Sequence, residues 1–191
     1  MRHKLLFALA ALGLVATPAL AADPIEGLAN TCNNCHGTGG VSVGLSMPSI
    51  AGLPAPYMKN ILMEWKSGAR SSANMTRLIK GYTDEEIAAL ANHYSKLPWS
   101  AQVQPVAKEL AMKGVEITER CETCHGVTGG QPDDNETPRL NGQWAKYLEL
   151  EMLKYRDPGF QMTHKKMIKN AQKLDEGDVA TAAKYYGAQS K

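Results

Sequence analysis

Two copies of one short motif restrict the folds open to this chain more than any other feature. Residues 31–40 read TCNNCHGTGG, and residues 121–130 read CETCHGVTGG. The resemblance continues downstream, where residues 47–65 align with 137–155 and residues 84–94 align with 176–186. Self-similarity at a long fixed period indicates a repeated structural unit, so we read the chain as a tandem duplication. The cysteines and the histidine of the motif recur in both copies: Cys32, Cys35 and His36 in the first, and Cys121, Cys124 and His125 in the second.

The duplication predicts two domains behind a cleaved leader. The first 21 residues have a basic start, an apolar run at 5–15 and a small-residue cleavage site at 19–21, which together are typical of a secretory signal peptide. We therefore expect a signal peptide at 1–21, a first domain at 22–97, a linker at 98–105 and a second domain at 106–191. The leader predicts export to a periplasm. No other stretch is apolar enough to span a bilayer, so we expect no membrane span in the mature protein.

The periodicity of both halves is helical. Thr83 and Glu86 have the spacing of a capping box, and Asp175 stands at the corresponding place of the second copy. Further amphipathic segments lie at 57–66 and 144–156, and a helix is expected from 106 to 120, before the second motif. Convincing period-two strands are absent, so we predict an all-α fold. The apolar stripes after the two caps are Ile87, Leu90, Ala91 and Tyr94, and Val179, Ala182, Ala183 and Tyr186.

Charge excludes one class of partner. The chain has 21 Lys and Arg against 19 Asp and Glu, and the leader takes Arg2 and Lys4 with it, so the mature chain is formally neutral. Nucleic-acid binding needs a basic excess or a basic stripe to neutralise phosphates, and neither is present.

All four cysteines of the chain fall within Cys-x-x-Cys-His, the attachment motif of c-type haem. Two thiols add to the two vinyl groups of one porphyrin, and the adjacent histidine becomes the proximal iron ligand. A disulfide framework fits poorly, since no cysteine lies outside the motifs, and a thioredoxin-like site would need a βαβ setting. A four-cysteine zinc site is the alternative that stays open, although it would leave both histidines unexplained. We therefore predict two covalently bound haem c groups, attached through Cys32 and Cys35, and through Cys121 and Cys124.

The sixth iron ligand is expected to be methionine, which electron-carrying cytochromes c commonly use. Met75 precedes Ile87 by twelve residues, and Met167 precedes Val179 by twelve. Counting from the haem motif instead nominates His164, which follows His125 by 39 residues, as Met75 follows His36. We favour Met167 and place the insertion in the preceding loop, because loops absorb insertions. The predicted axial pairs are therefore His36 with Met75 and His125 with Met167, with His164 as the rival of Met167.

With these residues in place, the chain resembles the cytochrome c4 family, in which two class I cytochrome c domains follow one another. More narrowly, it is similar to the dihaem cytochrome subunits of flavocytochrome c sulfide dehydrogenases. The stretches that carry this second resemblance are CHGTGGVSVGLSMPSIAG (35–52), MTRLIKGYTDEEIAALANHY (75–94), GGQP (129–132), GQWAKYL (142–148) and HKKM (164–167).

The resemblance implies an electron relay rather than an enzyme in its own right. Electrons would come from an FAD-containing flavoprotein subunit in a heterodimer, which as a whole would be a sulfide:cytochrome c oxidoreductase. They would leave to a soluble periplasmic acceptor such as a small cytochrome. No Gly-x-Gly-x-x-Gly follows a strand here, so any flavin would lie on the partner. A free-standing dihaem shuttle is the second interpretation, and a catalytic dihaem enzyme is the third.

Overall fold

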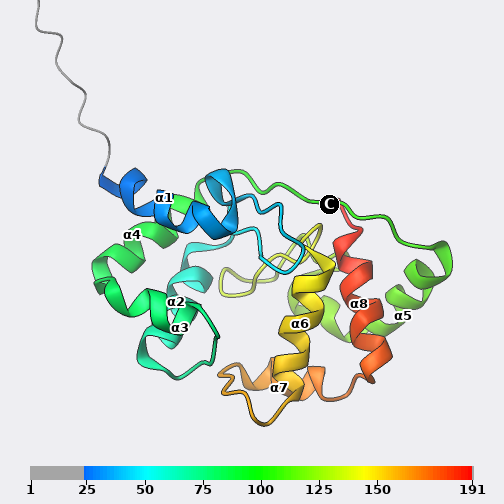
Figure 1. Ribbon diagram of the computed structural model, residues 1–191. Helices are drawn as coiled ribbons and strands as arrows, with labels where there is room; N and C mark the ends of the chain where they lie inside the picture. The colour runs from blue at the N-terminus through cyan, green and yellow to red at the C-terminus, as the bar shows by residue number, and fades with distance from the viewer. Residues whose placement is uncertain (1–23, 191) are drawn as a thin grey trace, which may run out of the picture.

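The computed structural model describes residues 24–190, and this part of the chain contains helices and no strand. The predicted all-α class is confirmed, whereas the predicted signal peptide at 1–21 lies outside the described residues. The chain folds into two lobes that lie side by side, one formed by the first helices and the other by the last (Figure 1). No helix of the described part is long and apolar enough to cross a membrane.

The first lobe is built around helix α4. Its elements in chain order are α1 (Pro24–His36), the 3₁₀ turn η1 (Thr38–Gly40), α2 (Ala55–Ser67), the short α3 (Met75–Leu78), the 3₁₀ turn η2 (Ile79–Gly81) and α4 (Asp84–Ser95). Helix α4 packs against α1 and α2. The buried apolar cluster between them is small, and it consists of Ala29, Leu53, Met58, Leu90, Ala91 and Tyr94.

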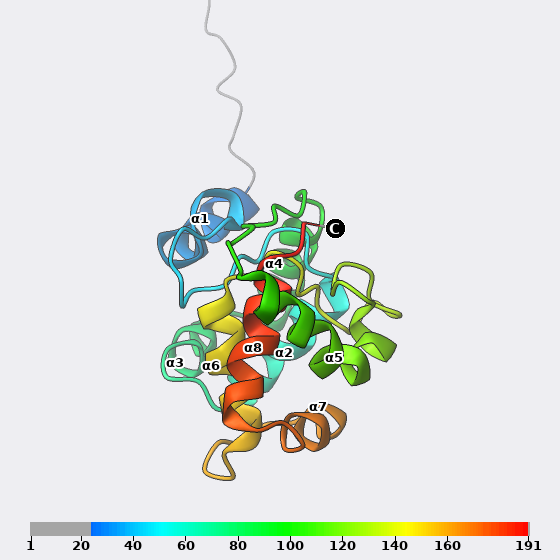
Figure 2. The ribbon, with the colours of Figure 1, turned by 90° about the vertical axis from the view of Figure 1, so that its right-hand side faces the viewer.

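The second lobe repeats the plan with helix α8 at its centre. Its helices are α5 (Lys108–His125), α6 (Ala145–Arg156), α7 (Lys165–Ala171) and α8 (Glu176–Gly187). Both α5 and α6 pack against α8, which lies between them in Figure 2. The buried apolar cluster is smaller still, with Leu148, Ala183, Tyr185 and Tyr186.

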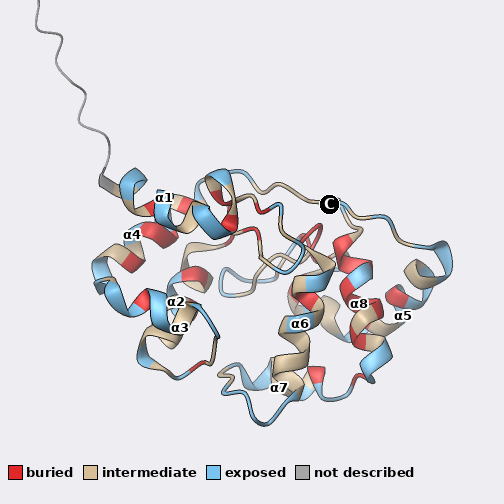
Figure 3. Cartoon of the chain, viewed as in Figure 1, coloured by how far each residue is buried: buried red, intermediate tan, exposed pale blue. Residues whose placement is uncertain are grey.

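The predicted capping box and stripes explain why the two closing helices form where they do. Thr83 accepts from the backbone N–H of Glu86, and the Glu86 carboxylate accepts from the backbone N–H of Thr83, so the capping box is confirmed. All eight residues of the two apolar stripes are buried, on the inward faces of α4 and α8 (Figure 3). Asp175 does occupy the N-cap position of α8, but its side chain accepts no capping hydrogen bond. The expected side-chain cap is therefore wrong in the second copy.

The segment between the lobes is extended and attached to the second lobe. Helix α4 ends at Ser95 and α5 begins at Lys108. Trp99 Nε1 donates to the carbonyl of Asn141 at 3.0 Å, and Gln104 Oε1 accepts from the backbone N–H of Ala145 at 2.8 Å. These bonds hold the connection along the lobe it leads into. Helix α5 continues to His125, five residues beyond the predicted end at 120.

Candidate haem sites

Both Cys-x-x-Cys-His motifs occupy the last turn of a helix, α1 in the first lobe and α5 in the second. Residues three and four apart on a helix share one face, so the two thiols and the imidazole of each motif lie along one side. A glycine then ends each helix with a positive φ, 79° at Gly37 and 77° at Gly126. A Cβ at Gly37 would lie 2.0 Å from the carbonyl oxygen of Val41, and one at Gly126 would lie 2.5 Å from that of Gln131. Glycine is thus required for the chain to turn back over the histidine.

The two histidines are buried and oriented in the same way. His36 is 9% exposed and His125 is 5% exposed. The Nδ1 atom of His36 lies 2.8 Å from the carbonyl oxygen of Pro48, and that of His125 lies 3.0 Å from the carbonyl oxygen of Pro138. A carbonyl oxygen only accepts, so Nδ1 carries the proton and the Nε2 lone pair of each ring is free. Burial lowers the pKa of both rings, which favours the neutral imidazole that a metal requires.

The cysteine environments argue against the thiol alternatives. Cys32 and Cys121 pack against the apolar clusters of their lobes, and burial raises the pKa of both thiols. Reactive redox cysteines have lowered pKa values instead. All four cysteines are free, and no group of three or more His, Cys, Asp or Glu among the described residues is arranged to hold a metal ion. The described residues thus form no four-cysteine zinc site, whereas thiols on one helix face beside an available imidazole nitrogen fit a covalently attached haem.

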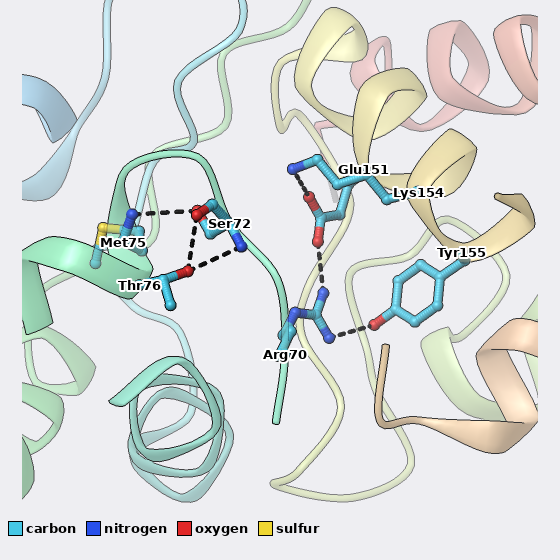
Figure 4. A network of polar contacts seen from close by, with 7 residues as sticks. All are labelled: Arg70, Ser72, Met75, Thr76, Glu151, Lys154 and Tyr155. Atoms are coloured by element: carbon cyan, nitrogen blue, oxygen red, sulfur yellow. Dashed lines mark hydrogen bonds and ion pairs between the residues drawn. The ribbon is translucent and has the colours of Figure 1, made fainter. Parts of the chain in front are cut away.

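Met75 is the first residue of α3 and is half-buried. Its backbone N–H donates to Ser72 Oγ at 3.1 Å. Thr76 Oγ1 accepts from the backbone N–H of Ser72 at 2.9 Å and donates to the Ser72 carbonyl at 2.7 Å (Figure 4). This small network fixes the turn that presents Met75.

In the second lobe the backbone N–H of the methionine also donates to a side chain three residues earlier, but here that residue is the N-cap of the helix. His164 is the N-cap of α7, and its Nδ1 accepts from the backbone N–H of Met167 at 3.4 Å. His164 thus stands where Ser72 stands in the first lobe, three residues before the methionine. Its ring is exposed, while Met167 is half-buried like Met75. From residue spacing, His164 is predicted only as a rival iron ligand, and its role as the N-cap of α7 is missed. The position of Ser72, also three residues before a methionine, could have indicated that role.

One pair of contacts between the lobes is matched. The backbone N–H of Tyr57 donates to the carbonyl of Asn135 at 3.3 Å, and the equivalent N–H of Tyr147 donates to the carbonyl of Leu45 at 3.1 Å. Each loop that follows a haem motif therefore reaches across to the helix of the other lobe.

A second set of contacts between the lobes is formed by the side chain of Gln143. Its Oε1 accepts from the N–H of Ser49 at 2.9 Å, and its Nε2 donates to the carbonyl of Ser49 at 2.8 Å. The neighbouring Trp144 Nε1 donates to the carbonyl of Ser42 at 2.9 Å. Because Gln143 and Ser49 are buried, these bonds are shielded from water and hold the two sites in a fixed relation. The sequence contains no signal for this role of Gln143.

Comparison with known proteins gives several relatives, although no family model matches the chain. The chain is 34% identical to the thiosulfate dehydrogenase electron acceptor of Thiomonas intermedia over 169 residues, which cover 82% of this chain and 76% of that protein. It is 29% identical to cytochrome c4 of Pseudomonas aeruginosa over 197 residues, 97% of this chain and 98% of that protein.

Two further comparisons concern a shorter stretch and the fold. The chain is 42% identical to the cytochrome subunit of sulfide dehydrogenase from Chlorobaculum tepidum, but over 72 residues only, 38% of this chain and 64% of that one. Among solved structures, reduced cytochrome c4 from Pseudomonas stutzeri superposes with a TM-score of 0.78 at 22% identity, over 87% of this chain and 97% of that one. The fold is thus that of two class I cytochrome c domains in tandem.

Proposed function

Because the chain belongs to the family of two-domain dihaem cytochromes that includes cytochrome c4 and the thiosulfate dehydrogenase electron acceptors, we propose that it relays electrons from a sulfur-oxidising enzyme to a soluble acceptor in the periplasm. As a cytochrome c4-like protein it carries two covalently bound haem c groups and transfers electrons. The observation that carries the proposal is the 34% identity to an electron acceptor of thiosulfate dehydrogenase along 82% of the chain.

The residues of each lobe have separate tasks in this proposal. Each haem supplies an iron that gains and loses one electron. Cys32 and Cys35 hold the first haem, and Cys121 and Cys124 hold the second. Nε2 of each buried histidine would be the nitrogen offered to the iron, because the proline carbonyl holds Nδ1. Met75 and Met167 would supply the thioether ligands of the two irons. Because protein side chains would then fill both coordination positions of each iron, no substrate would need to bind iron, and the chain would act as an electron carrier.

We propose an FAD-containing flavoprotein as the electron donor, in a heterodimer that oxidises sulfide. The 42% identity to a sulfide dehydrogenase cytochrome subunit supports this donor. A flavin that oxidises a two-electron donor delivers two electrons, and two haems can take one each. The loop after the first motif is uncharged and apolar, with Val43 87% exposed and Leu45 61% exposed. Stable interfaces deplete charge at their centre, so the first lobe is the side we assign to the flavoprotein.

A free-standing carrier is the second candidate, and a specific observation favours it. The alignments that cover both lobes are with cytochrome c4 and with a thiosulfate dehydrogenase electron acceptor, whereas the match to the sulfide dehydrogenase subunit covers 38% of the chain. In this case the donor is a separate dehydrogenase that docks transiently.

Native purification distinguishes the two donors. We expect the cytochrome to co-elute with a flavin-containing subunit at a one-to-one ratio, and sulfide to reduce both haems of that complex within the mixing time of a stopped-flow instrument. Elution as a free monomer that is reduced rapidly only by a thiosulfate dehydrogenase would support the second candidate. If neither the flavoprotein with sulfide nor a thiosulfate dehydrogenase reduces the cytochrome, the proposal that it relays electrons from a sulfur-oxidising enzyme is wrong.

We expect electrons to leave for the soluble acceptor at a lysine patch on and just after α7. The patch consists of Lys165, Lys166, Lys169 and Lys173, which are all exposed. Transient redox contacts are steered by charge and respond to ionic strength. Reversing Lys165, Lys166 and Lys169 to Glu is expected to invert the salt dependence of electron exit, measured by stopped-flow at several ionic strengths, and to leave complex assembly unchanged.

The matched control for the lysine patch is a triple reversal on the first lobe, where Lys59, Lys80 and Lys96 are also exposed. This control should leave the salt dependence of exit unchanged. Release of the flavoprotein by the α7 reversals would mean that the two lobes have been assigned to the wrong partners.

A further inference from the structure

One peptide group of the first lobe is hydrogen-bonded at both of its edges, once within its own lobe and once across the interface. The carbonyl of Pro48 and the N–H of Ser49 belong to the same planar peptide group, which is trans, so they point in opposite directions. The carbonyl oxygen lies 2.8 Å from Nδ1 of His36, and the N–H donates to Oε1 of Gln143 in the second lobe at 2.9 Å. A single peptide group therefore links the ring of His36 to the side chain of Gln143.

The amide of Gln143 fits this place in one orientation. Its Oε1 also accepts from the backbone N–H of Trp144 at 3.1 Å, and its Nε2 donates to the carbonyl of Ser49 at 2.8 Å. The reverse orientation would set donor against donor and acceptor against acceptor. Gln143 is 3% exposed and Ser49 is 1% exposed, so water does not compete for these bonds.

The second lobe does not have this link. His125 Nδ1 lies 3.0 Å from the carbonyl oxygen of Pro138, and the residue that follows is Arg139. The N–H of Arg139 forms no hydrogen bond in the described part of the chain. At the offset of 90 residues, Gln143 corresponds to Leu53, which belongs to the apolar cluster of the first lobe. The two proximal histidines thus share the bond to a proline carbonyl and differ in what holds that carbonyl.

A hydrogen bond at one edge of a peptide group strengthens the bond at its other edge. When Gln143 Oε1 accepts from the N–H of Ser49, the carbonyl oxygen of Pro48 gains negative charge and becomes a better acceptor for the Nδ1–H of His36. Linked hydrogen bonds strengthen one another by about 10–30% each. A stronger bond at Nδ1 makes Nε2, the nitrogen offered to the iron, more basic, and a more basic ligand favours the ferric state.

We propose that Gln143 of the second lobe is a positioning residue for the proximal ligand of the first haem. By accepting from the N–H of Ser49, it fixes the Pro48 carbonyl, strengthens the bond of that carbonyl to His36 and lowers the potential of the first haem. The potential of one haem is therefore set partly by a side chain of the other lobe. This inference uses the two haems and does not depend on the identity of the electron donor or acceptor.

Potentiometric titration of the full-length dihaem protein with Gln143→Leu tests the proposal, because leucine is the residue at the equivalent position of the first lobe. Loss of a direct partner of a metal ligand changes metal affinity or activity by about 10–100-fold, and Gln143 acts through one further peptide group. We therefore expect the reduction equilibrium of the first haem to rise about threefold, which is about 28 mV at about 59 mV per tenfold change. The second haem should keep its potential, and NMR spectra at intermediate potentials assign each step to its haem.

The ring N–H signals of the two histidines give a readout that is local to each site. In proton NMR spectra of the reduced protein, the Nδ1–H signal of His36 should move upfield in Gln143→Leu, because its hydrogen bond weakens. The signal of His125 should stay in place, so the second site is an internal control in the same sample. Gln143→Glu retains an oxygen acceptor for the N–H of Ser49, so it should not move the His36 signal upfield and should not raise the potential.

Two substitutions weaken the same interface without touching the peptide group that Gln143 holds. Trp144→Phe removes the hydrogen bond of its Nε1 to the first lobe. Tyr155→Phe removes the bond that the buried Arg70 of the first lobe donates from Nη1 at 2.9 Å, and it leaves the ion pair of Arg70 with Glu151 in place (Figure 4). Neither control should move the ring N–H signal of either proximal histidine.

The sign of the shift separates this role from simple support of the interface. If Gln143 only held the lobes together, its replacement would admit water to the first site, and water stabilises the more highly charged ferric state and lowers the potential. A lowered or unchanged potential in Gln143→Leu, an unmoved His36 signal, or an equal movement of that signal in Trp144→Phe would overturn the proposal. If Gln143→Leu does not accumulate as a folded protein, Gln143→Met fills a similar volume without the amide and has to give the same two results.

Discussion

Protein produced without haem attachment is expected to lose most of its far-UV helical circular dichroism. The buried apolar cluster has six residues in the first lobe and four in the second, which is little core for domains of this size. Cys32 and Cys121 pack against these clusters, so attached haem extends the same apolar interior. Protein interiors are close-packed, and the space that a haem fills cannot remain as a void. Cytoplasmic expression, compared with export to a compartment that attaches haem, provides the measurement.

Serine variants of one motif at a time give the matched controls for that experiment. Cys32→Ser with Cys35→Ser should remove one haem from the intact mass and about half of the helical signal, because the other lobe keeps its own haem. Cys121→Ser with Cys124→Ser should do the same for the second lobe. Full helicity in the haem-free wild type would show that the apolar clusters suffice by themselves. Loss of all helicity in either double variant would show that the lobes do not fold independently.

The repeat explains how much of the fold can be predicted. Duplicated spacing by itself puts both motifs and both closing helices in register, and it puts both methionines in register when they are counted back from those helices. The buried faces of α4 and α8 can be predicted from the spacing of apolar residues such as Ile87 and Val179. Helical periodicity depends only on residues that are close in sequence. The capping box at Thr83 follows for the same reason, since all its atoms lie within one turn.

Contacts between the lobes cannot be predicted in the same way. Ser49 and Gln143 are 94 residues apart, and Arg70 and Glu151 are 81 apart. Neither pair stands at equivalent positions of the repeat, so the duplication does not suggest that they meet. Arg70 is one of 21 basic residues in the sequence, and only burial against α6 distinguishes it from the solvated ones. The role of His164 escapes prediction for a related reason, because spacing from the motif counts residues and says nothing of which backbone donor a ring faces.

Replacement of either proposed distal methionine is expected to have the largest effect on the spectrum. Met75→Ala and Met167→Ala should each remove about half of the near-infrared sulfur-to-iron band of the oxidised protein. Each should also lower one midpoint potential, because a thioether ligand favours the ferrous state. Near-infrared absorption and potentiometric titration of the dihaem protein provide the two measurements. Met112→Ala is a suitable control, since this methionine is 65% exposed on α5 and should affect neither.

Variants of His164 and of its equivalent Ser72 test whether Met167 or His164 is the second distal ligand. His164 Nδ1 accepts from the N–H of Met167, as Ser72 Oγ does from the N–H of Met75, so both residues have a structural task that needs no iron. His164→Ala should cost about 1 kcal/mol in the free energy of unfolding, the usual value of a lost N-cap. Ser72→Ala should cost about the same, because it removes one hydrogen bond to the backbone N–H of Met75. Both variants should keep the whole near-infrared band, because each retains its thioether. If His164→Ala changes the haem spectrum while Met167→Ala leaves the band whole, the second iron is bound by two histidines. The methionine register would then hold for the first lobe alone.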